Sequence, residues 1–269
     1  MLAAVVQLTS TSDAEGSTAT AEALIRRAAG YGAALIATPE CTNYLGPHKK
    51  KVALAESVDG PTCQRFGALA AELGVTLLLG SFNEAVPGET ARCANTSVLF
   101  GPDGARLAVY RKLHLFDVDV PGMRFHESDT CVPGDEVVVA DSPAGRMGLS
   151  ICYDLRFPEL YRAHVDQGAQ LLAVPSAFTA TTGKAHWEPL LRARAIETQC
   201  YVLAPGQVGH HDDGGLRHSH GHSMIIDPWG AVVAQCSDGP GLALAELDLQ
   251  RVAQVRKGMP VAAHRKVGP

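Results

Sequence analysis

Apolar segments of strand length alternate with segments of helical periodicity along the entire chain, and this alternation restricts the fold more than any other feature. The strand-like runs lie at 2–8, 33–37, 75–80, 137–140, 146–151, 171–175, 201–205, 222–227, 232–236 and 242–247. The helix-like segments lie at 13–30, 62–73, 158–167, 184–198 and 250–257. Strands separated by helices are typical of parallel pairing, whereas the turn at 101–104 between the short strands 96–100 and 105–110 predicts an antiparallel hairpin. The sequence therefore predicts mixed pairing in two packed sheets that are covered by helices.

No linker, internal repeat or low-complexity tract interrupts the chain, so we expect one domain over residues 1–269. The net charge is −5 and the longest basic stretch is His48–Lys51, which argues against nucleic acid or an anionic membrane as a partner. No apolar run reaches the ~18 residues of a membrane span, and residues 1–8 resemble a buried strand rather than a signal peptide. We therefore expect a cytoplasmic protein.

Common catalytic and metal-binding motifs are missing from the sequence. Its 7 cysteines include no CxxC pair, which excludes zinc ribbons and thioredoxin-type redox motifs. The sequence also contains no GxSxG, GxGxxG, Walker A or HExxH pattern. The segment 111–134 has little periodicity and is rich in charge, aromatic residues, proline and glycine, which is typical of a functional loop.

Three reactive side chains stand where apolar strand-like segments end. Glu40 follows the second such segment, Lys112 follows the predicted hairpin, and Cys152 lies between a strand-like segment and the helix-like segment that begins with Pro158. Strand ends are where α/β proteins assemble their sites, because the sheet holds the backbone while side chains project into a crevice. Taken singly, each residue has a simpler interpretation: a solvated turn glutamate, a surface lysine and a packed cysteine. The three together are candidates for a catalytic site.

Longer stretches around these residues resemble a known family. Pro39-Glu40, the block YRKLHLFD at 110–117 and the block ICYDLRFPEL at 151–160 resemble the three signature blocks of the nitrilase superfamily. The resemblance continues over 186–187, 192–202 and 221–230. It therefore spans nearly the whole chain.

This resemblance implies a Glu–Lys–Cys amidohydrolase on a single-domain α-β-β-α sandwich, an α/β (α+β) fold of four layers. By motif position, Cys152 is the nucleophile, Glu40 the general base and Lys112 the stabiliser of the transition state. Glu127 matches a further, supporting glutamate, and the backbone N–H of Tyr153 would complete an oxyanion hole with Lys112. An amide would then be cleaved to a carboxylate and ammonia through a thioester. The resemblance implies no metal or organic cofactor, and it implies a homodimer.

The blocks at 111–119 and 195–201 most resemble the branch that contains deaminated glutathione amidases and ω-amidases. Substrates of that branch are small amides that carry carboxylates, so the site needs cationic or polar groups beyond Lys112. Nitrile hydrolysis and N-carbamoyl amide hydrolysis by the same three residues are the alternatives.

Four residues are candidates for binding such a substrate. Arg124 lies close in sequence to Glu127, and Ser176, Phe178 and Thr179 follow the strand-like segment 171–175. The simpler interpretation is that these residues only pack or face solvent near the site.

A dense group of histidines suggests a different class of function. Five histidines fall within His210–His222, a density that is compatible with a metal-binding or metal-sensing module. The neighbouring aspartates and glycines favour a flexible loop instead, and the histidine spacing fits no catalytic zinc pattern. An inactive homologue that only binds its ligand is a third possibility, disfavoured because every expected catalytic residue type is present.

Overall fold

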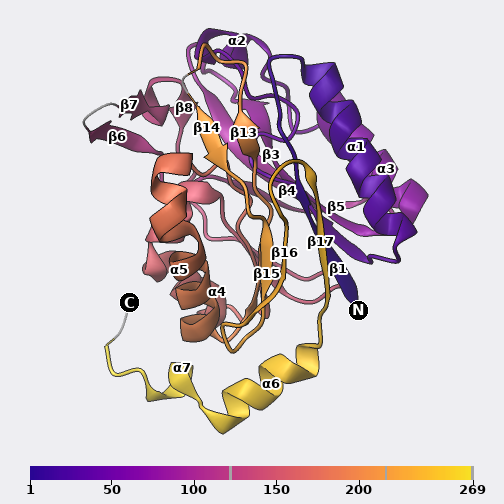
Figure 1. Ribbon diagram of the computed structural model, residues 1–269, viewed down its shortest axis with the longest axis vertical. Coiled ribbons are helices and arrows are strands. Elements are labelled where there is room, and N and C mark those ends of the chain that lie inside the picture. The colour runs from indigo at the N-terminus through magenta and orange to yellow at the C-terminus, as the bar shows by residue number, and fades with distance from the viewer. Residues whose placement is uncertain (121–122, 216, 268–269) are drawn as a thin grey trace.

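The computed structural model describes residues 1–120, 123–215 and 217–267, and the two expected sheets lie in its interior (Figure 1). The first sheet has the order β17-β1-β2-β3-β4-β5, with β8 paired to β4. Its strands are β1 (Leu2–Gln7), β2 (Leu35–Ala37), β3 (Thr76–Ala85), β4 (Cys93–Phe100), β5 (Arg106–Arg111), β8 (Cys131–Val132) and β17 (Gly241–Glu246). β1, β2 and β3 are parallel, and the pairs β3–β4 and β4–β5 are antiparallel. The predicted hairpin is the pair β4–β5.

The second sheet has the order β16-β15-β12-β11-β10-β9. Its strands are β9 (Val139–Ala140), β10 (Met147–Leu149), β11 (Leu171–Ala173), β12 (Tyr201–Ala204), β15 (Met224–Ile226) and β16 (Val232–Gln235). The three central strands β10, β11 and β12 are parallel, and the strands on either side of them are antiparallel. Both sheets thus have the mixed pairing that the sequence predicts.

Helices cover the outer face of each sheet, which gives four layers and confirms the predicted fold class. α1 (Ala14–Gly30) and α3 (Pro61–Leu73) pack on the first sheet, and α4 (Pro158–Asp166) and α5 (Ala180–Thr198) pack on the second (Figure 1). α1 begins where the side chain of Asp13 accepts a hydrogen bond from the Gly16 N–H. α6 (Leu249–Gly258) and α7 (Val261–His264) follow the last strand.

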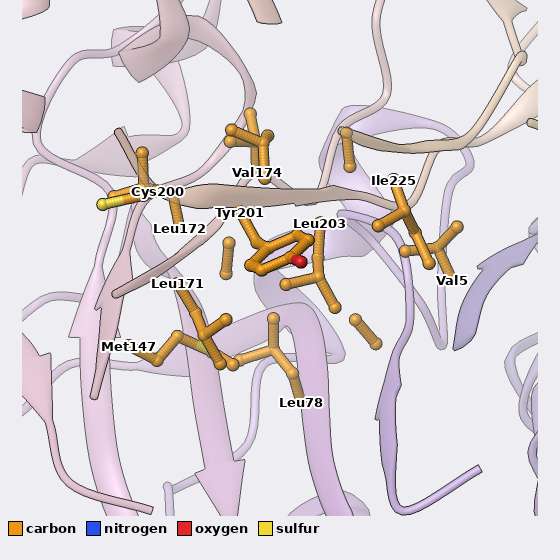
Figure 2. Packing of buried hydrophobic residues seen from close by; sticks show 14 of the residues in the cluster. Val5, Leu78, Met147, Leu171, Leu172, Val174, Cys200, Tyr201, Leu203 and Ile225 are labelled. Carbon is orange, nitrogen blue, oxygen red and sulfur yellow. The ribbon is translucent and has the colours of Figure 1, made fainter. Parts of the chain in front are cut away.

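The hydrophobic core covers both faces of the first sheet because strands such as β1 and β2 are apolar on both faces. In β1, Ala3 and Val5 belong to the cluster between the sheets, whereas Ala4 and Val6 belong to the cluster beneath α1 and α3. Figure 2 shows Val5 and Leu78 of the first sheet together with Leu171 and Leu203 of the second. A strand buried on both faces has no polar side, which explains its continuous apolar sequence.

Several short elements differ from the sequence prediction. The segment 111–134 contains the hairpin strands β6 (Asp117–Val120) and β7 (Met123–His126) and the 3₁₀ helix η1 (Glu127–Asp129). The expected loop at 210–222 contains the hairpin strands β13 (Val208–His210) and β14 (His218–His220). The helix α2 (His48–Ala53) was not predicted, and α5 begins four residues before the predicted segment, at Ala180. Residues 121, 122 and 216 of these two predicted loops lie outside the described part of the chain.

Two further features concern the helices and the cysteines. Among the helices of the described residues, none combines the length and apolar character that crossing a membrane requires. All 7 cysteines are free thiols.

Candidate active site

The ends of three strands bring the predicted catalytic residues to one cavity. Glu40 follows β2, Lys112 follows β5, and Cys152 follows β10 as the first residue of the 3₁₀ helix η2 (Cys152–Arg156). Their exposed fractions are 4%, 2% and 9%. All three side chains line the same cavity together with Glu127, which is 5% exposed. The structure thus brings the four predicted residues together in one cavity, with little exposure to bulk water.

Lys112 lies between the two carboxylates. Its Nζ donates hydrogen bonds to Glu40 Oε1 at 2.9 Å and to Glu127 Oε2 at 2.8 Å. Burial alone would lower the pKa of Lys112, but Glu127 and Glu40 raise that pKa well above its ordinary value. Lys112 is therefore an ammonium at neutral pH, which suits it to stabilise negative charge and not to act as a base.

Glu127 is held as an anion. Burial acts to raise its pKa, but Lys112, Lys51 and hydrogen bonds outweigh that effect and lower the pKa to about 2. One of those hydrogen bonds comes from the Phe116 N–H, which donates to Glu127 Oε2 at 2.8 Å. A carboxylate held ionised in this way positions Lys112 without itself carrying a proton.

The backbone at Cys152 is strained. Its φ is 48°, in the left-handed region that residues other than glycine seldom adopt, and strain of this kind is often found at functional sites. The Cys152 N–H donates to the Pro175 carbonyl at 2.9 Å, which helps to hold this conformation. The pKa of the Cys152 thiol lies well above its ordinary value, mainly because of burial and further because of Glu40, with Lys112 opposing both. In the free enzyme Cys152 is therefore a neutral thiol.

A buried carboxylate, Asp154, holds the backbone around Cys152 in place. It is fully buried and accepts a hydrogen bond from the Ile151 N–H at 2.8 Å, which closes the turn on which Cys152 lies. It also accepts hydrogen bonds from Tyr110 Oη at 2.7 Å and from the His114 N–H at 3.0 Å. Tyr110 and His114 flank Lys112 in the sequence, so Asp154 connects the cysteine block to the lysine block.

Glu40 is positioned by a close approach of two strands. A Cβ atom at Gly80 of β3 would lie 1.9 Å from the Thr38 carbonyl oxygen. Only glycine at position 80 therefore leaves room for the backbone that leads from β2 to Glu40. The Glu40 carboxylate then accepts a hydrogen bond on Oε2 from the Ala177 N–H at 2.7 Å. Glu40 therefore reaches across from the first sheet to the loop that follows β11 of the second.

Asn95 of β4 belongs to the same cluster and was not predicted. Its Nδ2 donates to Glu40 Oε1 at 2.8 Å and to Glu127 Oε1 at 3.1 Å, so one amide connects the two carboxylates. Asn95 is the first of three polar residues in the run Ala94–Val98, in a strand whose residues are all buried. A side-chain amide inside a buried strand needs hydrogen-bond partners, and that requirement is the only feature of the sequence from which Asn95 could have been predicted.

The four predicted substrate-binding residues divide into one that lines the cavity and three that do not. Thr179 lines the cavity, at the position before α5 begins. Ser176 is fully buried and its hydroxyl donates to the Val174 carbonyl at 3.1 Å. Phe178 packs against Trp187, with ring centroids 5.1 Å apart. The side chain of Arg124 is 76% exposed and lies 3.9 Å from Asp119.

The alternation of side chains along β7 explains the position of Arg124. Neighbouring residues of a strand point to opposite faces, and it is Phe125 that lines the cavity. In place of Arg124, the cavity wall contains two other cations, Lys51 of α2 and Arg217 near the start of β14. Arg217 lies within the histidine-rich segment.

The histidines of 210–222 take part in contacts of the β13–β14 hairpin. His211 is buried between Ser10 and Ser219, with its ring nitrogens 2.8 Å from the Ser10 carbonyl and 2.8 Å from the Ser219 hydroxyl. The His210 and His218 rings stack with centroids 4.0 Å apart. Among the described residues, no group of three or more His, Cys, Asp or Glu side chains is arranged to hold a metal ion. The hairpin places Arg217 and His218 at the cavity wall.

Comparison with known proteins identifies the family of this chain. The carbon-nitrogen hydrolase family model matches residues 2–257. A deaminated glutathione amidase of Bos taurus is 47% identical over 270 residues, an alignment that covers 98% of this chain and 82% of the bovine protein.

Solved structures show the same fold. The NitFhit protein of Caenorhabditis elegans superimposes with a TM-score of 0.93 at 44% identity, covering 98% of this chain and 65% of that longer chain. A mutant amidase of Nesterenkonia sp. AN1, whose active-site cysteine carries a Michael adduct of acrylamide, superimposes with a TM-score of 0.79 at 26% identity. That alignment covers 96% of this chain and 99% of the amidase. This chain therefore belongs to the carbon-nitrogen hydrolase family of the nitrilase superfamily and is a hydrolase of carbon–nitrogen bonds.

Proposed function

We propose that this enzyme hydrolyses small amides that carry a carboxylate, such as deaminated glutathione or a related α-keto-acid amide, through a thioester on Cys152. The observation that carries the proposal is the buried contact of Lys112 with both Glu40 and Glu127, at 2.9 and 2.8 Å, in the cavity that contains Cys152. The relatives named deaminated glutathione amidase support the substrate class. No step of the proposed reaction needs a metal or an organic cofactor.

In the first step, the Cys152 sulfur attacks the amide carbon while its proton passes to Glu40. Because the resting thiol is neutral, proton removal accompanies attack, which is the task of a general base. The oxyanion that forms is stabilised by the Lys112 ammonium and by the backbone N–H of Tyr153. Tyr153 lies in the first turn of η2, one residue before Asp154, whose N–H donates to the Ile151 carbonyl. Backbone N–H groups in the first turn of a helix have no hydrogen-bond partner within that helix. Glu40 then returns the proton to the leaving nitrogen.

In the second step, Glu40 accepts a proton from a water molecule that attacks the thioester. The same oxyanion hole stabilises the second tetrahedral intermediate, and Cys152 leaves as a thiol after taking the proton from Glu40. Glu127 keeps Lys112 in place through both steps. Glu40 thus alternates between base and acid, which a carboxylate buried next to one fixed ammonium can do without a second proton carrier.

A substrate panel tests this function. We expect amides with a carboxylate to have the highest kcat/KM among deaminated glutathione, α-ketoglutaramate, neutral amides, nitriles and N-carbamoyl amino acids. Glutathione is a tripeptide, so cleavage of a secondary amide in its deaminated form releases an amine, and the assay must measure amine as well as ammonia. Preference for a nitrile or an N-carbamoyl compound would assign the same three residues to one of the alternative reactions.

We also propose a homodimer, because exposed apolar side chains gather near the end of α5. Ile196 of α5, Trp229 and Met259 are 46%, 58% and 42% exposed. Gly230, the residue after Trp229, lies so close to Ile196 that a Cβ atom on it would touch that side chain. Trp229 and Met259 line one shallow hollow. These side chains therefore form a continuous patch. Apolar patches of this kind commonly mark protein interfaces.

Trp229→Glu is expected to shift the protein from dimer to monomer, because the new carboxylate would be buried without a partner in the interface. Sedimentation velocity of the wild type and of the variant measures this shift. Leu107→Glu is the matched control, since Leu107 is 38% exposed on β5 of the other sheet. A wild-type monomer, or a Trp229→Glu variant that remains a dimer, would contradict the proposed interface.

We further propose a single domain over 1–269 in a reducing compartment such as the cytoplasm. The cluster between the sheets includes Ala3 near one end of the chain and Val252 near the other, which supports one cooperative unit. The free thiols support a reducing environment, because disulfides are rare where thiols are kept reduced.

A further inference from the structure

One wall of the active-site cavity contains polar side chains that the proposed mechanism does not use. These are Lys51 and His48 of α2 and Arg217 next to β14, and all three line the cavity with the catalytic residues. Figure 1 shows α2 and the β13–β14 hairpin toward the same end of the molecule. The Phe125 ring connects these side chains, because its centroid lies 5.0 Å from that of His48 and 5.9 Å from the Arg217 guanidinium carbon.

Lys51 is a cation without a carboxylate partner. Its Nζ lies 2.8 Å from Cys131 Sγ and 3.3 Å from Thr130 Oγ1, and none of the ion pairs between described residues includes it. Burial would lower the pKa of Lys51, but Cys131 and Glu127 raise that pKa above its ordinary value. Lys51 is therefore an ammonium at neutral pH, with at least one N–H available to a ligand in the cavity.

Thr130 connects Lys51 to the ring of His48. Thr130 Oγ1 accepts from Lys51 Nζ and lies at hydrogen-bond distance, 3.2 Å, from His48 Nδ1. Burial, with Arg217 and Lys51, lowers the pKa of His48 to about 4, so the ring is neutral at pH 7 and carries one proton. His48 Nε2 is buried and has no hydrogen-bond partner among the described residues.

Arg217 contributes the second positive charge of this wall. Its Nε donates to Asp213 Oδ2 at 2.6 Å and one Nη donates to the Gly46 carbonyl at 2.8 Å. These two bonds fix the guanidinium plane, and a guanidinium has five N–H donors in total, so others remain for a ligand.

We propose that Lys51, His48 and Arg217 form a subsite that binds a carboxylate of the substrate, an inference that rests on the proposed amidase function. Lys51 and Arg217 have only donors and both are positive, and the neutral ring of His48 lies beside them. A carboxylate has two oxygens that accept several hydrogen bonds and a charge opposite to theirs, whereas a neutral ligand group would lack the charge-assisted part of those bonds. The subsite therefore selects amides with a negative charge.

The alternative is that Lys51 is purely structural and serves only to hold Cys131, whose Sγ lies 3.9 Å from Glu127 Oε1. In that case the loss of Lys51 would disturb Glu127 and Lys112, and the hydrolysis of every amide would fall by the same factor. A carboxylate subsite predicts instead that carboxylated amides are affected more than other amides.

Succinamate and butyramide separate these two cases, because they differ only in a carboxylate in place of a methyl group. We expect the wild-type enzyme to have the higher kcat/KM with succinamate. We expect Lys51→Met to lower the ratio of the two kcat/KM values about ten- to a hundredfold, mainly through KM for succinamate, since a charge-assisted hydrogen bond is lost. Any loss that Lys51→Met causes through Glu127 should lower the hydrolysis of both amides by the same factor, so the ratio isolates the contact with the carboxylate.

Lys51→Arg should restore most of the preference, and Lys50→Met is the matched control, since Lys50 is exposed on the same helix. An unchanged ratio in Lys51→Met, or an equal loss with both amides, would overturn the subsite while leaving the amidase function intact. If the wild-type enzyme hydrolysed nitriles but neither amide, the proposed function itself would fail, and the subsite with it.

Discussion

Cys152→Ala is expected to abolish amide hydrolysis and to leave the fold intact. The variant keeps Lys112 and both carboxylates but lacks an atom that can form the thioester, so kcat should fall by on the order of 10⁴-fold or more. The change removes one sulfur from a residue that is 9% exposed, so it should alter the free energy of unfolding by only about 1 kcal/mol. Product release measured at saturating substrate, together with thermal unfolding by circular dichroism, checks both expectations.

Cys63→Ala is the matched control for this experiment. Cys63 is also a buried thiol, 4% exposed, but it lies on α3 in the outer helical layer and does not line the cavity. Its replacement should leave kcat unchanged within about twofold. Amide hydrolysis retained by Cys152→Ala at more than a few per cent of the wild-type rate would contradict the nucleophilic role of Cys152.

The parts of this fold that the sequence predicts are those whose burial dictates the residue types. β1 and β2 were predicted because strands that are buried on both faces are apolar over continuous stretches, as 2–6 and 35–37 are. The β13–β14 hairpin was not predicted because it lies outside both main sheets and pairs His210 with His218, Gly209 with Ser219 and Val208 with His220. Its pairing depends on backbone hydrogen bonds, which leave little trace in the sequence.

The candidate site was also predictable only in part: its three catalytic residues were predicted, and other residues that contact them were not. Glu40, Lys112 and Cys152 follow apolar strands, so the sheets bring them together once those strands are recognised. Asn95 contacts carboxylates that are 55 and 32 positions away, and a single amide within a strand has no periodic pattern that announces such distant partners. Arg124, and not Lys51 or Arg217, was predicted as the cation that binds the substrate carboxylate. The strand pairing within 111–134 was unknown at that point, and the sequence alone does not reveal which residues of this segment face the cavity.

Glu40→Gln is expected to halt the reaction after the acyl group has been transferred to Cys152. Glu40 raises the pKa of the Cys152 thiol, so removal of its charge should lower that pKa and favour the thiolate next to Lys112. A reactive aryl ester, whose leaving group needs no proton, should therefore still acylate the enzyme. Water has no base to activate it in this variant, so the thioester should persist and kcat should fall by on the order of 10³-fold or more.

Intact-protein mass spectrometry of Glu40→Gln mixed with the aryl ester should show the mass of one acyl group, placed on Cys152 by peptide mapping. Glu127→Gln is the informative comparison, because it also removes one carboxylate from Lys112 but keeps the proposed base. Its kcat should fall as Lys112 loses a partner, yet no acyl-enzyme should accumulate, since Glu40 still activates water. Accumulation in both variants would assign the slow step to the loss of charge around Lys112. The two variants differ in which carboxylate remains to accept the proton of water. Turnover by Glu40→Gln without a detectable adduct would therefore show that Glu40 has no role in the hydrolytic step.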